Sequence, residues 1–216
     1  MINAAIVGLG WWGQTLVESV TNSSQKIRFS TAVSRSASQK AKDFSQLHKM
    51  NLVQNFDDVL ADPNIDAVVL ATPHSLHAQE VIKAAQAGKH VFCEKPFALS
   101  KAEAESAVSA TQKAGVTLGL GYNRRLHPEM IKLRERIDSG DLGVILHCEA
   151  NMTFPNALFL SSDAWRASKE ETPCGGLTPM GVHAIDGMID LCGEIDEVYC
   201  QSFKRAVEVD ADDTTS

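Results

Sequence analysis

The first thirteen residues constrain the fold more than any other part of the chain. An apolar run over residues 2–7 predicts a buried β-strand, which passes into a glycine-rich turn and then a helical pattern. The turn has G-x-G-x-x-G spacing, with Gly8, Gly10 and Gly13 as its glycines. In such a unit the first glycine permits the tight turn, the second lets backbone amides approach a pyrophosphate, and the third allows close packing of helix on strand. Glycine-rich turns also occur for purely steric reasons, but this context favours dinucleotide binding.

Two tryptophans occupy the variable positions of this turn. We expect Trp11 and Trp12 to be packing and pocket-wall residues that leave their backbone amides to the phosphates. The helix that follows directs its N-terminal amides and the positive end of its dipole at the anion.

Strand and helix signals alternate through the first 120 residues. After the first strand, five more are predicted near residues 29–34, 52–53, 65–71, 90–93 and 116–120. The fourth of the six strands is almost continuously apolar and β-branched, which is typical of a parallel strand covered on both faces. Strands separated by helices form a doubly wound parallel sheet. We therefore predict an α/β, Rossmann-type nucleotide-binding domain over residues 1–122.

Serines and glycines mark the ends of several predicted helices. Ser75 is a candidate N-cap, and Gly88 suits the position just after the end of the same helix. Ser100 and Glu103 form a capping-box pattern at the start of the next one.

Beyond residue 122 the pattern changes. A helix is predicted over 128–139, an alternating strand over 144–153, a helix from Pro179 to Cys192, and a strand over 197–203. These elements begin an α+β domain over residues 123–216. Two strands make a poor sheet for independent stability, so we expect this domain to be incomplete within the 216 residues.

Composition narrows the class of protein. A hydrophobic content of 44% and a charged content of 22% are ordinary for a soluble globular protein. The net charge of −7, without a lysine- or arginine-rich block, gives no reason to expect nucleic-acid or membrane partners. No apolar stretch approaches the ~20 residues that a membrane helix needs. Five cysteines without a C-x-x-C motif are typical of reduced packing residues in a cytoplasmic protein.

Four segments follow strands or lie near them in places where open α/β sheets bind ligands. They cover residues 71–77, 94–96, 121–125 and 175–186. The second is the tripeptide E-K-P, and the last contains G-x-H-x-x-D. Together with G-x-G-x-x-G, these motifs make the chain resemble the Gfo/Idh/MocA family, the relatives of glucose-fructose oxidoreductase and inositol dehydrogenase. The resemblance covers essentially all of the chain.

The resemblance implies an NAD(P)-dependent oxidoreductase that transfers a hydride between the cofactor and a hydroxyl or keto group of a sugar, cyclitol or related polyol. It places Lys95 beside the nicotinamide and the substrate hydroxyl, and makes His183 the active-site histidine. A lysine has an ordinary pKa of ~10.4, so it acts as a base near neutrality only if burial or nearby cations lower that value. In the ketone-reducing direction a protonated Lys95 donates instead. Its place before Pro96 argues against the alternative of a surface lysine in an ion pair.

One position departs from the family pattern. The family usually carries an aspartate four residues before the histidine, and this chain has Pro179 there. Pro179 suits the first position of a helix with Thr178 as its N-cap. Three alternatives follow: Lys95 and His183 suffice, another acid such as Asp186 substitutes, or catalysis is altered. Separately, Asp186 at i+3 from His183 lies close enough to orient the imidazole. The loss of the aspartate favours a non-catalytic dinucleotide-binding regulator, and a truncated chain leaves the further alternative of an inactive nucleotide-binding fragment.

The residues after the second predicted strand bear on the choice of cofactor. A site that prefers NAD normally has Asp or Glu about 20 residues after the glycine turn, bound to the ribose 2′-hydroxyl. This chain has Ser34, Arg35 and Ser36 instead. Arg35 can pair with a 2′-phosphate, and the serines can hydrogen-bond to it, which favours NADP over NAD. The alternative is that Arg35 stacks over the adenine, as arginine can with either cofactor.

Other cofactor contacts are implied by the resemblance. Thr72 and Pro73 match a nicotinamide-ribose contact made largely by backbone, and Glu94 belongs to the E-K-P motif. His77 matches a family position and is interpreted as a loop-fixing hydrogen bonder. His74 and His77 lack an evident third ligand, so no metal site is predicted.

The second domain contributes fewer predictions. Trp165 and Arg166 match a W-R pair near the cofactor in the family. Asn123 and Arg124 resemble a segment that borders the active site, whereas Arg125 is interpreted as solvated. The family also commonly forms homo-oligomers through the open sheet of its second domain.

Overall fold

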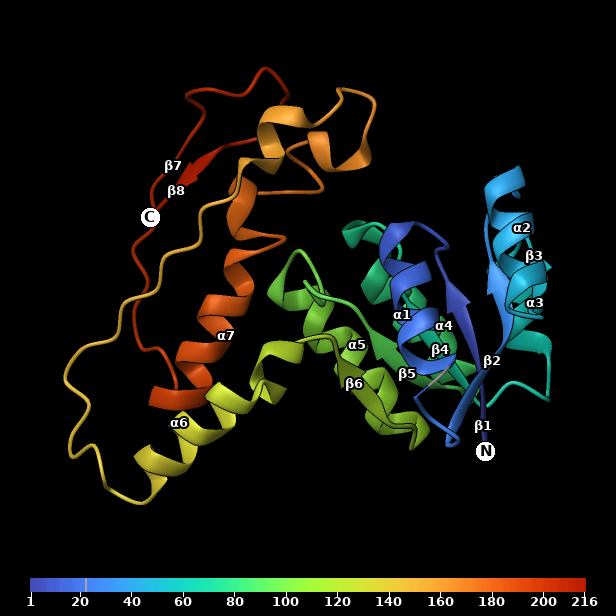
Figure 1. The fold of residues 1–216 in the computed structure, drawn as a ribbon, viewed down its shortest axis with the longest axis horizontal. Helices are drawn as coiled ribbons and strands as arrows, with labels where there is room; N and C mark the ends of the chain where they lie inside the picture. The colour runs from blue at the N-terminus through green and yellow to red at the C-terminus, as the bar shows by residue number, and fades with distance from the viewer. Residues whose placement is uncertain (22) are drawn as a thin grey trace. The chain divides into compact units, whose positions relative to one another are not determined.

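The computed structural model describes residues 1–21 and 23–216. The chain divides into two compact units, Met1–Gly121 and Tyr122–Ser216, which are described separately (Figure 1).

A six-stranded parallel sheet forms the centre of the first unit. Its order is β3-β2-β1-β4-β5-β6. The strands are β1 Ile2–Val7, β2 Ile27–Val33, β3 Asn51–Val53, β4 Ala67–Leu70, β5 His90–Cys93 and β6 Leu118–Leu120. From β1 the chain adds strands toward one side of the sheet, and from β4 it adds them toward the other. The boundary between β1 and β4 is therefore the switch point, where open α/β sheets bind ligands. The predicted α/β, Rossmann-type fold is confirmed.

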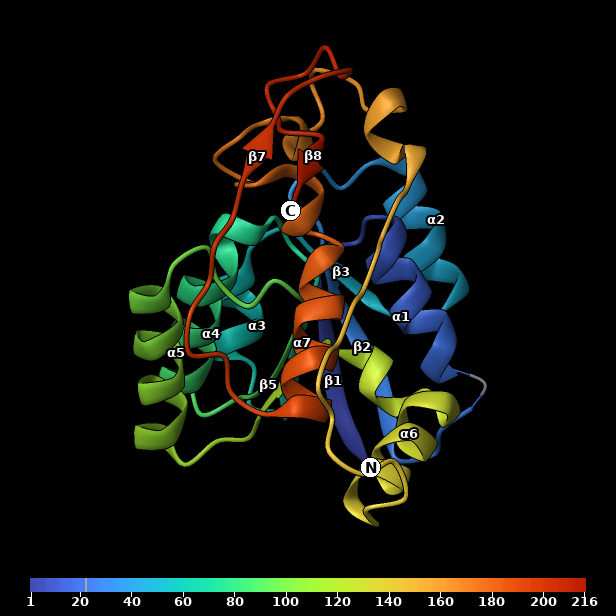
Figure 2. The same ribbon diagram turned by 90° about the vertical axis from the view of Figure 1, so that its left-hand side faces the viewer.

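Helices cover both faces of this sheet (Figure 2). They are α1 Trp11–Thr21, α2 Gln39–Leu47, α3 Phe56–Ala61, α4 His77–Gln86 and α5 Lys101–Ala114. Successive side chains of strand β4 point to opposite faces of the sheet. Val68 and Leu70 join the core under α3, α4 and α5, whereas Val69 packs against the core under α1 and α2. An apolar residue is therefore needed at every position of this strand.

Two of the three predicted helix ends are confirmed. The Ser100 hydroxyl accepts a hydrogen bond from the Glu103 amide at 3.3 Å, and Gly88 follows α4 with φ +72°. The prediction for Ser75 is wrong, because α4 is preceded by the 3₁₀ turn η1, His74–Leu76, and Leu76 occupies the N-cap position. Pro73 begins this tight turn, so Ser75 lies inside it.

The second unit is built around two helices, α6 Pro128–Asp138 and α7 Gly181–Cys192. Short 3₁₀ turns and one antiparallel pair of two-residue strands accompany them. These elements are η2 Asn123–Leu126, η3 Pro155–Phe159, η4 Trp165–Ala167, η5 Gly175–Leu177, β7 Ser202–Phe203 and β8 Thr214–Thr215. The predicted helix over 128–139 is confirmed.

Three other predictions for this unit are wrong in whole or in part. Of the strand predicted over 197–203, only the last two residues form a strand, β7. Residues 144–153 form no strand, and Val144 and Leu146 are 82% and 90% exposed. An alternating pattern becomes a strand only beside a partner that satisfies its backbone groups, and the described part of the chain places none there. Helix α7 begins at Gly181 rather than Pro179, because residues 178–180 form a turn and the Thr178 hydroxyl donates to the Pro173 carbonyl.

The glycine turn owes its shape to close contacts between backbones. A Cβ on Gly8 (φ +95°) would lie 2.5 Å from the Ala71 carbonyl oxygen, and one on Gly13 would lie 2.0 Å from the Gly8 carbonyl oxygen. A Cβ on Gly10 would meet nothing within 4 Å. Gly8 and Gly13 therefore allow β1, β4 and α1 to pack together, whereas Gly10 borders open space.

No described helix has the combination of length and apolar character needed to span a bilayer.

We expect Gly13→Ala to destabilise the first unit. The added methyl group overlaps the Gly8 carbonyl oxygen, and such overpacking costs about 1–3 kcal/mol. Urea unfolding should show this loss of unfolding free energy. Gly10→Ala is the matched control and should stay within about 0.5 kcal/mol of wild type. Wild-type stability in Gly13→Ala would contradict the close packing described.

Candidate dinucleotide and active site

The start of α1 presents an anion site at the switch point of the sheet. The helix begins at Trp11, directly after Gly10, and its first turn contains no acidic residue. The Gly10 carbonyl accepts from the Gln14 amide at 3.0 Å. The first amides of a helix lack intrahelical partners and carry the positive end of its dipole. Together with the open space at Gly10, this arrangement fits a pyrophosphate.

The two tryptophans of the turn differ in exposure. Trp11 is 75% exposed and Trp12 is half-buried. Their ring centroids lie 5.4 Å apart with the planes tilted by 48°. The Trp12 indole Nε1 is buried and has no hydrogen-bond partner among the described residues. Trp12 is therefore partly packed, whereas Trp11 is too exposed to be the packing residue predicted. Their role as pocket-wall residues stays a prediction.

The segment after β2 contains a cation and no carboxylate. Ser34 is fixed by backbone hydrogen bonds, donating its amide to the Val53 carbonyl at 3.0 Å. Arg35 and Ser36 are exposed, and the Arg35 carbonyl accepts from the Gln54 side chain at 3.1 Å. These residues leave the Arg35 guanidinium accessible at the edge of the sheet where the glycine turn also lies.

His77 lies between two loops at the carboxyl ends of β4 and β5. It is only 1% exposed. Its Nδ1 lies 2.7 Å from the Pro96 carbonyl oxygen, and its Nε2 lies 3.0 Å from the Thr72 carbonyl oxygen. The first turn of α4 therefore fixes the spacing between the Thr72-Pro73 loop and the E-K-P loop.

Glu80 fixes the same threonine from the next turn of α4. The Thr72 hydroxyl donates to the Glu80 carboxylate at 2.6 Å. Burial raises the pKa of Glu80, and this effect is opposed first by the hydrogen bond from Thr72 and then by the charges of Arg35 and Lys83. Both the hydroxyl and the carbonyl of Thr72 are therefore engaged by α4, by Glu80 and His77 respectively, and its contact with a cofactor stays a prediction.

The E-K-P loop holds a buried carboxylate beside a half-buried lysine. Glu94 is buried, and its Oε2 accepts from the Lys95 amide at 3.2 Å. A Cβ on Gly121 would lie 2.7 Å from that oxygen, so the glycine makes room for the carboxylate. The Lys95–Pro96 peptide is cis. Lys95 itself is half-buried at the end of β5.

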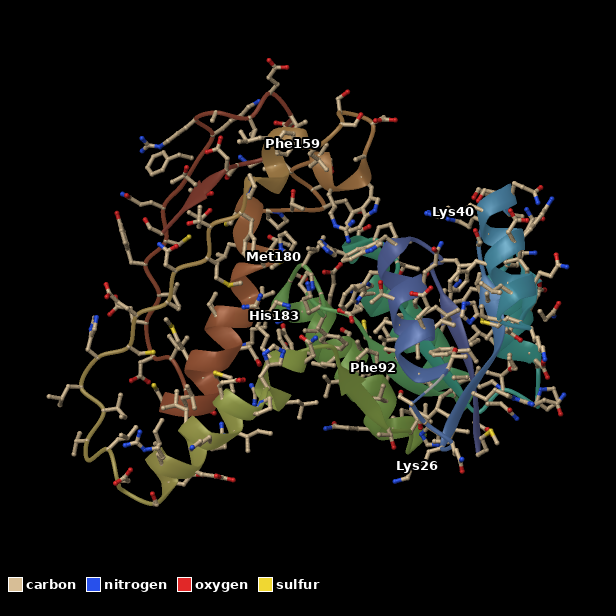
Figure 3. All side chains as sticks on the ribbon, in the orientation of Figure 1. Lys26, Lys40, Phe92, Phe159, Met180 and His183 are labelled. Carbon is tan, nitrogen blue, oxygen red and sulfur yellow. The ribbon has the colours of Figure 1, made fainter. Side chains whose placement is uncertain are left out.

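In the second unit, His183 lies on the buried side of α7, one turn after Met180 (Figure 3). The Tyr122 ring meets it edge to face, with centroids 6.2 Å apart and planes at 86°. Pro179 lies in the turn before the helix and contributes no carboxylate.

Arg125 is exposed, but it also forms an ion-pair network with α7, so the prediction that it is only solvated is wrong. It donates to both carboxylate oxygens of Asp186, at 2.8 and 2.5 Å, and to Asp190 at 2.6 Å. The hydrogen bond that Arg125 donates to Asp186 is the largest effect that raises the pKa of Arg125. Arg134 also donates to Asp190, at 3.2 Å. Asp186 is therefore paired with an arginine, which weakens the alternative that it replaces the missing acid.

The W-R pair lies on η4. The Arg166 guanidinium carbon is 4.1 Å from the centroid of the Trp165 ring, and burial lowers the pKa of Arg166. No group of three or more His, Cys, Asp or Glu residues in the described ranges could hold a metal ion.

The sheet order and the glycine turn at its switch point define a dinucleotide-binding α/β protein. Residues 2–122 match the model of the oxidoreductase family with an NAD-binding Rossmann fold, and residues 130–216 match the Gfo/Idh/MocA C-terminal domain. The chain therefore belongs to the Gfo/Idh/MocA family of oxidoreductases.

Three known proteins illustrate the similarity. The uncharacterised oxidoreductase YrbE of Bacillus subtilis (strain 168) is 31% identical over 206 residues, covering 93% of this chain and 57% of its own length. A proposed NADPH-dependent oxidoreductase from Desulfitobacterium hafniense has a solved structure with a TM-score of 0.90 and 26% identity, covering 99% of this chain and 61% of its own. The structure of levoglucosan dehydrogenase with NADH and levoglucosan has a TM-score of 0.82 and 25% sequence identity. The match covers 99% of this chain and 62% of that one. The chain thus spans about three fifths of each of these proteins.

The half-buried position of Glu80 predicts a pH effect on stability. Because the pKa in the folded protein is raised above 4.5, the folded state favours the protonated carboxyl. Its contribution is most favourable below 4.5 and is lost as the pH rises through the folded value. Glu80→Gln should therefore gain stability relative to wild type between pH 4 and pH 7.

Urea unfolding at the two pH values tests this expectation. Glu105→Gln, at an exposed position of α5, is the control and should show a smaller change. A Glu80→Gln difference that does not vary with pH would refute the effect of burial.

Proposed function

We propose that the protein is an NAD(P)-dependent oxidoreductase that acts on a hydroxyl or keto group of a sugar, cyclitol or related polyol. The observation that carries the proposal is the E-K-P loop, which holds Lys95 at the carboxyl end of β5 and is tied through His77 to the loop after β4. Family membership supports the reaction class. The levoglucosan dehydrogenase structure, solved with NADH and a sugar, supports the substrate class.

The proposed cofactor is NADP in preference to NAD. The pyrophosphate is assigned to the glycine turn and the start of α1, and the 2′-phosphate to Ser34 and Arg35. The segment over residues 34–36 has an arginine and lacks the carboxylate that binds the ribose 2′-hydroxyl of NAD, so it suits the 2′-phosphate of NADP better. The full set of assigned residues is Gly8, Gly10, Trp11, Trp12, Gly13, Ser34, Arg35, Thr72, Pro73, His77, Glu94, Lys95 and Arg166.

Lys95 and His183 are the proposed catalytic residues. When bound, the nicotinamide supplies or accepts the hydride. Lys95 Nζ would exchange the proton of the reacting hydroxyl, donating it when a ketone is reduced. In the opposite direction it would accept that proton, which requires its neutral form. His183 would hydrogen-bond the reacting oxygen and orient it.

A second candidate function is a dinucleotide-binding regulator without catalysis. Pro179 favours it, because this position provides no carboxylate and Asp186 is engaged by Arg125. The two candidates share the cofactor site and differ in turnover, so binding and activity are tested separately.

Cofactor binding is tested by titrating NADPH and NADH and following their fluorescence. Arg35→Ala should lower the affinity for NADPH by about tenfold to a hundredfold, the value of a charged hydrogen bond, and leave NADH almost unchanged. Gly10→Ala should weaken both cofactors by narrowing the phosphate site. Equal losses for both cofactors in Arg35→Ala would favour stacking on adenine, and no saturable binding by wild type would refute the nucleotide site.

Catalysis is tested with a panel of sugars and polyols, followed by the absorbance of the reduced cofactor. Lys95→Ala should lower kcat by about 10²–10⁴-fold, the typical contribution of a general acid or base. NADPH affinity should fall much less than kcat, because Lys95 is only one of the residues assigned to the cofactor. Unchanged turnover in Lys95→Ala would refute its role. Cofactor binding without wild-type turnover of any panel member would favour the regulator.

A further inference from the structure

Four of the five cysteines lie in the second unit, and they fall into two neighbouring pairs. The Cys192 thiol contributes to raising the pKa of Cys148, and the Cys200 thiol contributes to raising the pKa of Cys174. All of them are free thiols. The fifth, Cys93, is buried in the sheet of the first unit.

Backbone contacts independently hold Cys174 near Cys200. The Thr215 hydroxyl donates to the Cys174 carbonyl at 2.8 Å. Gln201 and Ser216, the residues that follow Cys200 and Thr215, exchange two backbone hydrogen bonds of 2.7 and 2.9 Å. The β7–β8 ladder therefore holds the chain at Cys200 beside the turn that contains Cys174, although α7 separates the two cysteines in the sequence.

The turn at Cys174 is packed tightly against the segment that precedes β8. Cys174 has φ +60°, which is uncommon for a residue with a side chain. A Cβ on the next residue, Gly175, would lie 1.8 Å from the Asp212 carbonyl oxygen. The backbone at Cys174 is thus held by a close-packed part of the unit.

We propose that Cys174 and Cys200 form a site of reversible disulfide formation, with a low-molecular-weight disulfide such as oxidised glutathione as the oxidant. The exposed Cys200 thiolate attacks the glutathione disulfide, whose S–S bond breaks and releases one glutathione thiolate. The Cys174 thiolate then attacks the mixed disulfide and releases the second. Two protein thiols and one oxidised glutathione yield one protein disulfide and two reduced glutathiones.

The order of attack follows from the surroundings of the two sulfurs. Burial raises the pKa of Cys174, followed by the charge and hydrogen bond of Cys200 and the charge of Asp212, against a smaller lowering effect of Lys169. A thiol with a raised pKa has less thiolate and is the slower first nucleophile. Cys200 is exposed and therefore reacts first, whereas Cys174 resolves the mixed disulfide.

The bond would join two segments on either side of α7. Cys174 precedes η5 and the turn that leads into α7, and Cys200 precedes β7. A disulfide between these residues would restrain the chain segment that leads into α7, the helix that carries His183. The proposal concerns thiol chemistry and is independent of the proposed oxidoreductase function.

The experiment treats the folded full chain with oxidised glutathione and maps its disulfides by mass spectrometry. The sequence contains no lysine or arginine between Lys169 and Lys204, so a protease that cuts after Glu and Asp is required. Cleavage at Asp186 and Asp190 separates the peptide of Cys174 from that of Cys192, and cleavage at Glu197 releases the peptide of Cys200. We expect a Cys174–Cys200 linked peptide that has lost two hydrogens and disappears with dithiothreitol.

Variants distinguish the proposed pathway from random oxidation. Cys174→Ser should retain glutathione on Cys200, because the resolving thiol is absent. Cys192→Ser is the matched control and should form the bridge as wild type does. Unfolding in guanidinium before oxidation should abolish the preference for this pair. Free thiols at both positions after treatment, or linkage of Cys200 to Cys148, Cys192 or another chain, would overturn the proposal.

Discussion

The first unit depends on one close approach of backbones, where the start of α1 lies on the end of β1 and beside the residue that follows β4. Gly8 and Gly13 permit it, because a Cβ at either position would overlap a carbonyl oxygen. The contact sets the direction of α1 and points its free amides at the carboxyl ends of the strands. There the connections that follow β1 and β4 leave toward opposite sides of the sheet. The space left at Gly10 is a consequence of the same packing.

The first two turns of α4 organise the other side of this edge. His77 contacts the backbone carbonyls of Thr72 and Pro96, and Glu80 accepts from the Thr72 hydroxyl. One buried helix end therefore sets the relative positions of two loops that follow different strands. Residues that would contact a cofactor are in this way fixed by residues that lie beneath them.

The sequence was sufficient for features encoded by neighbouring residues. The six strands, the glycine turn and the Ser100 cap each depend on a short local pattern of polarity or on a conformational preference. The strand expected over 144–153 failed because pairing requires a neighbour that periodicity cannot report. Glu80 was missed as a support of the site, since a single glutamate on a helix carries no signal of burial. Arg125 was misread because its partners lie 61 and 65 residues further along the chain.

The pairing of Arg125 has a consequence for the helix it contacts. Asp186 and Asp190 stand one turn apart on α7, and like charges at this spacing destabilise an isolated helix. In the folded unit a single guanidinium bridges both carboxylates and turns their repulsion into a shared attraction. The repulsion between these two carboxylates is thus offset only after η2, the turn that carries Arg125, has packed against α7. The peptide corresponding to α7 alone is a poorer helix than the one in the protein, and its order is conferred by tertiary structure.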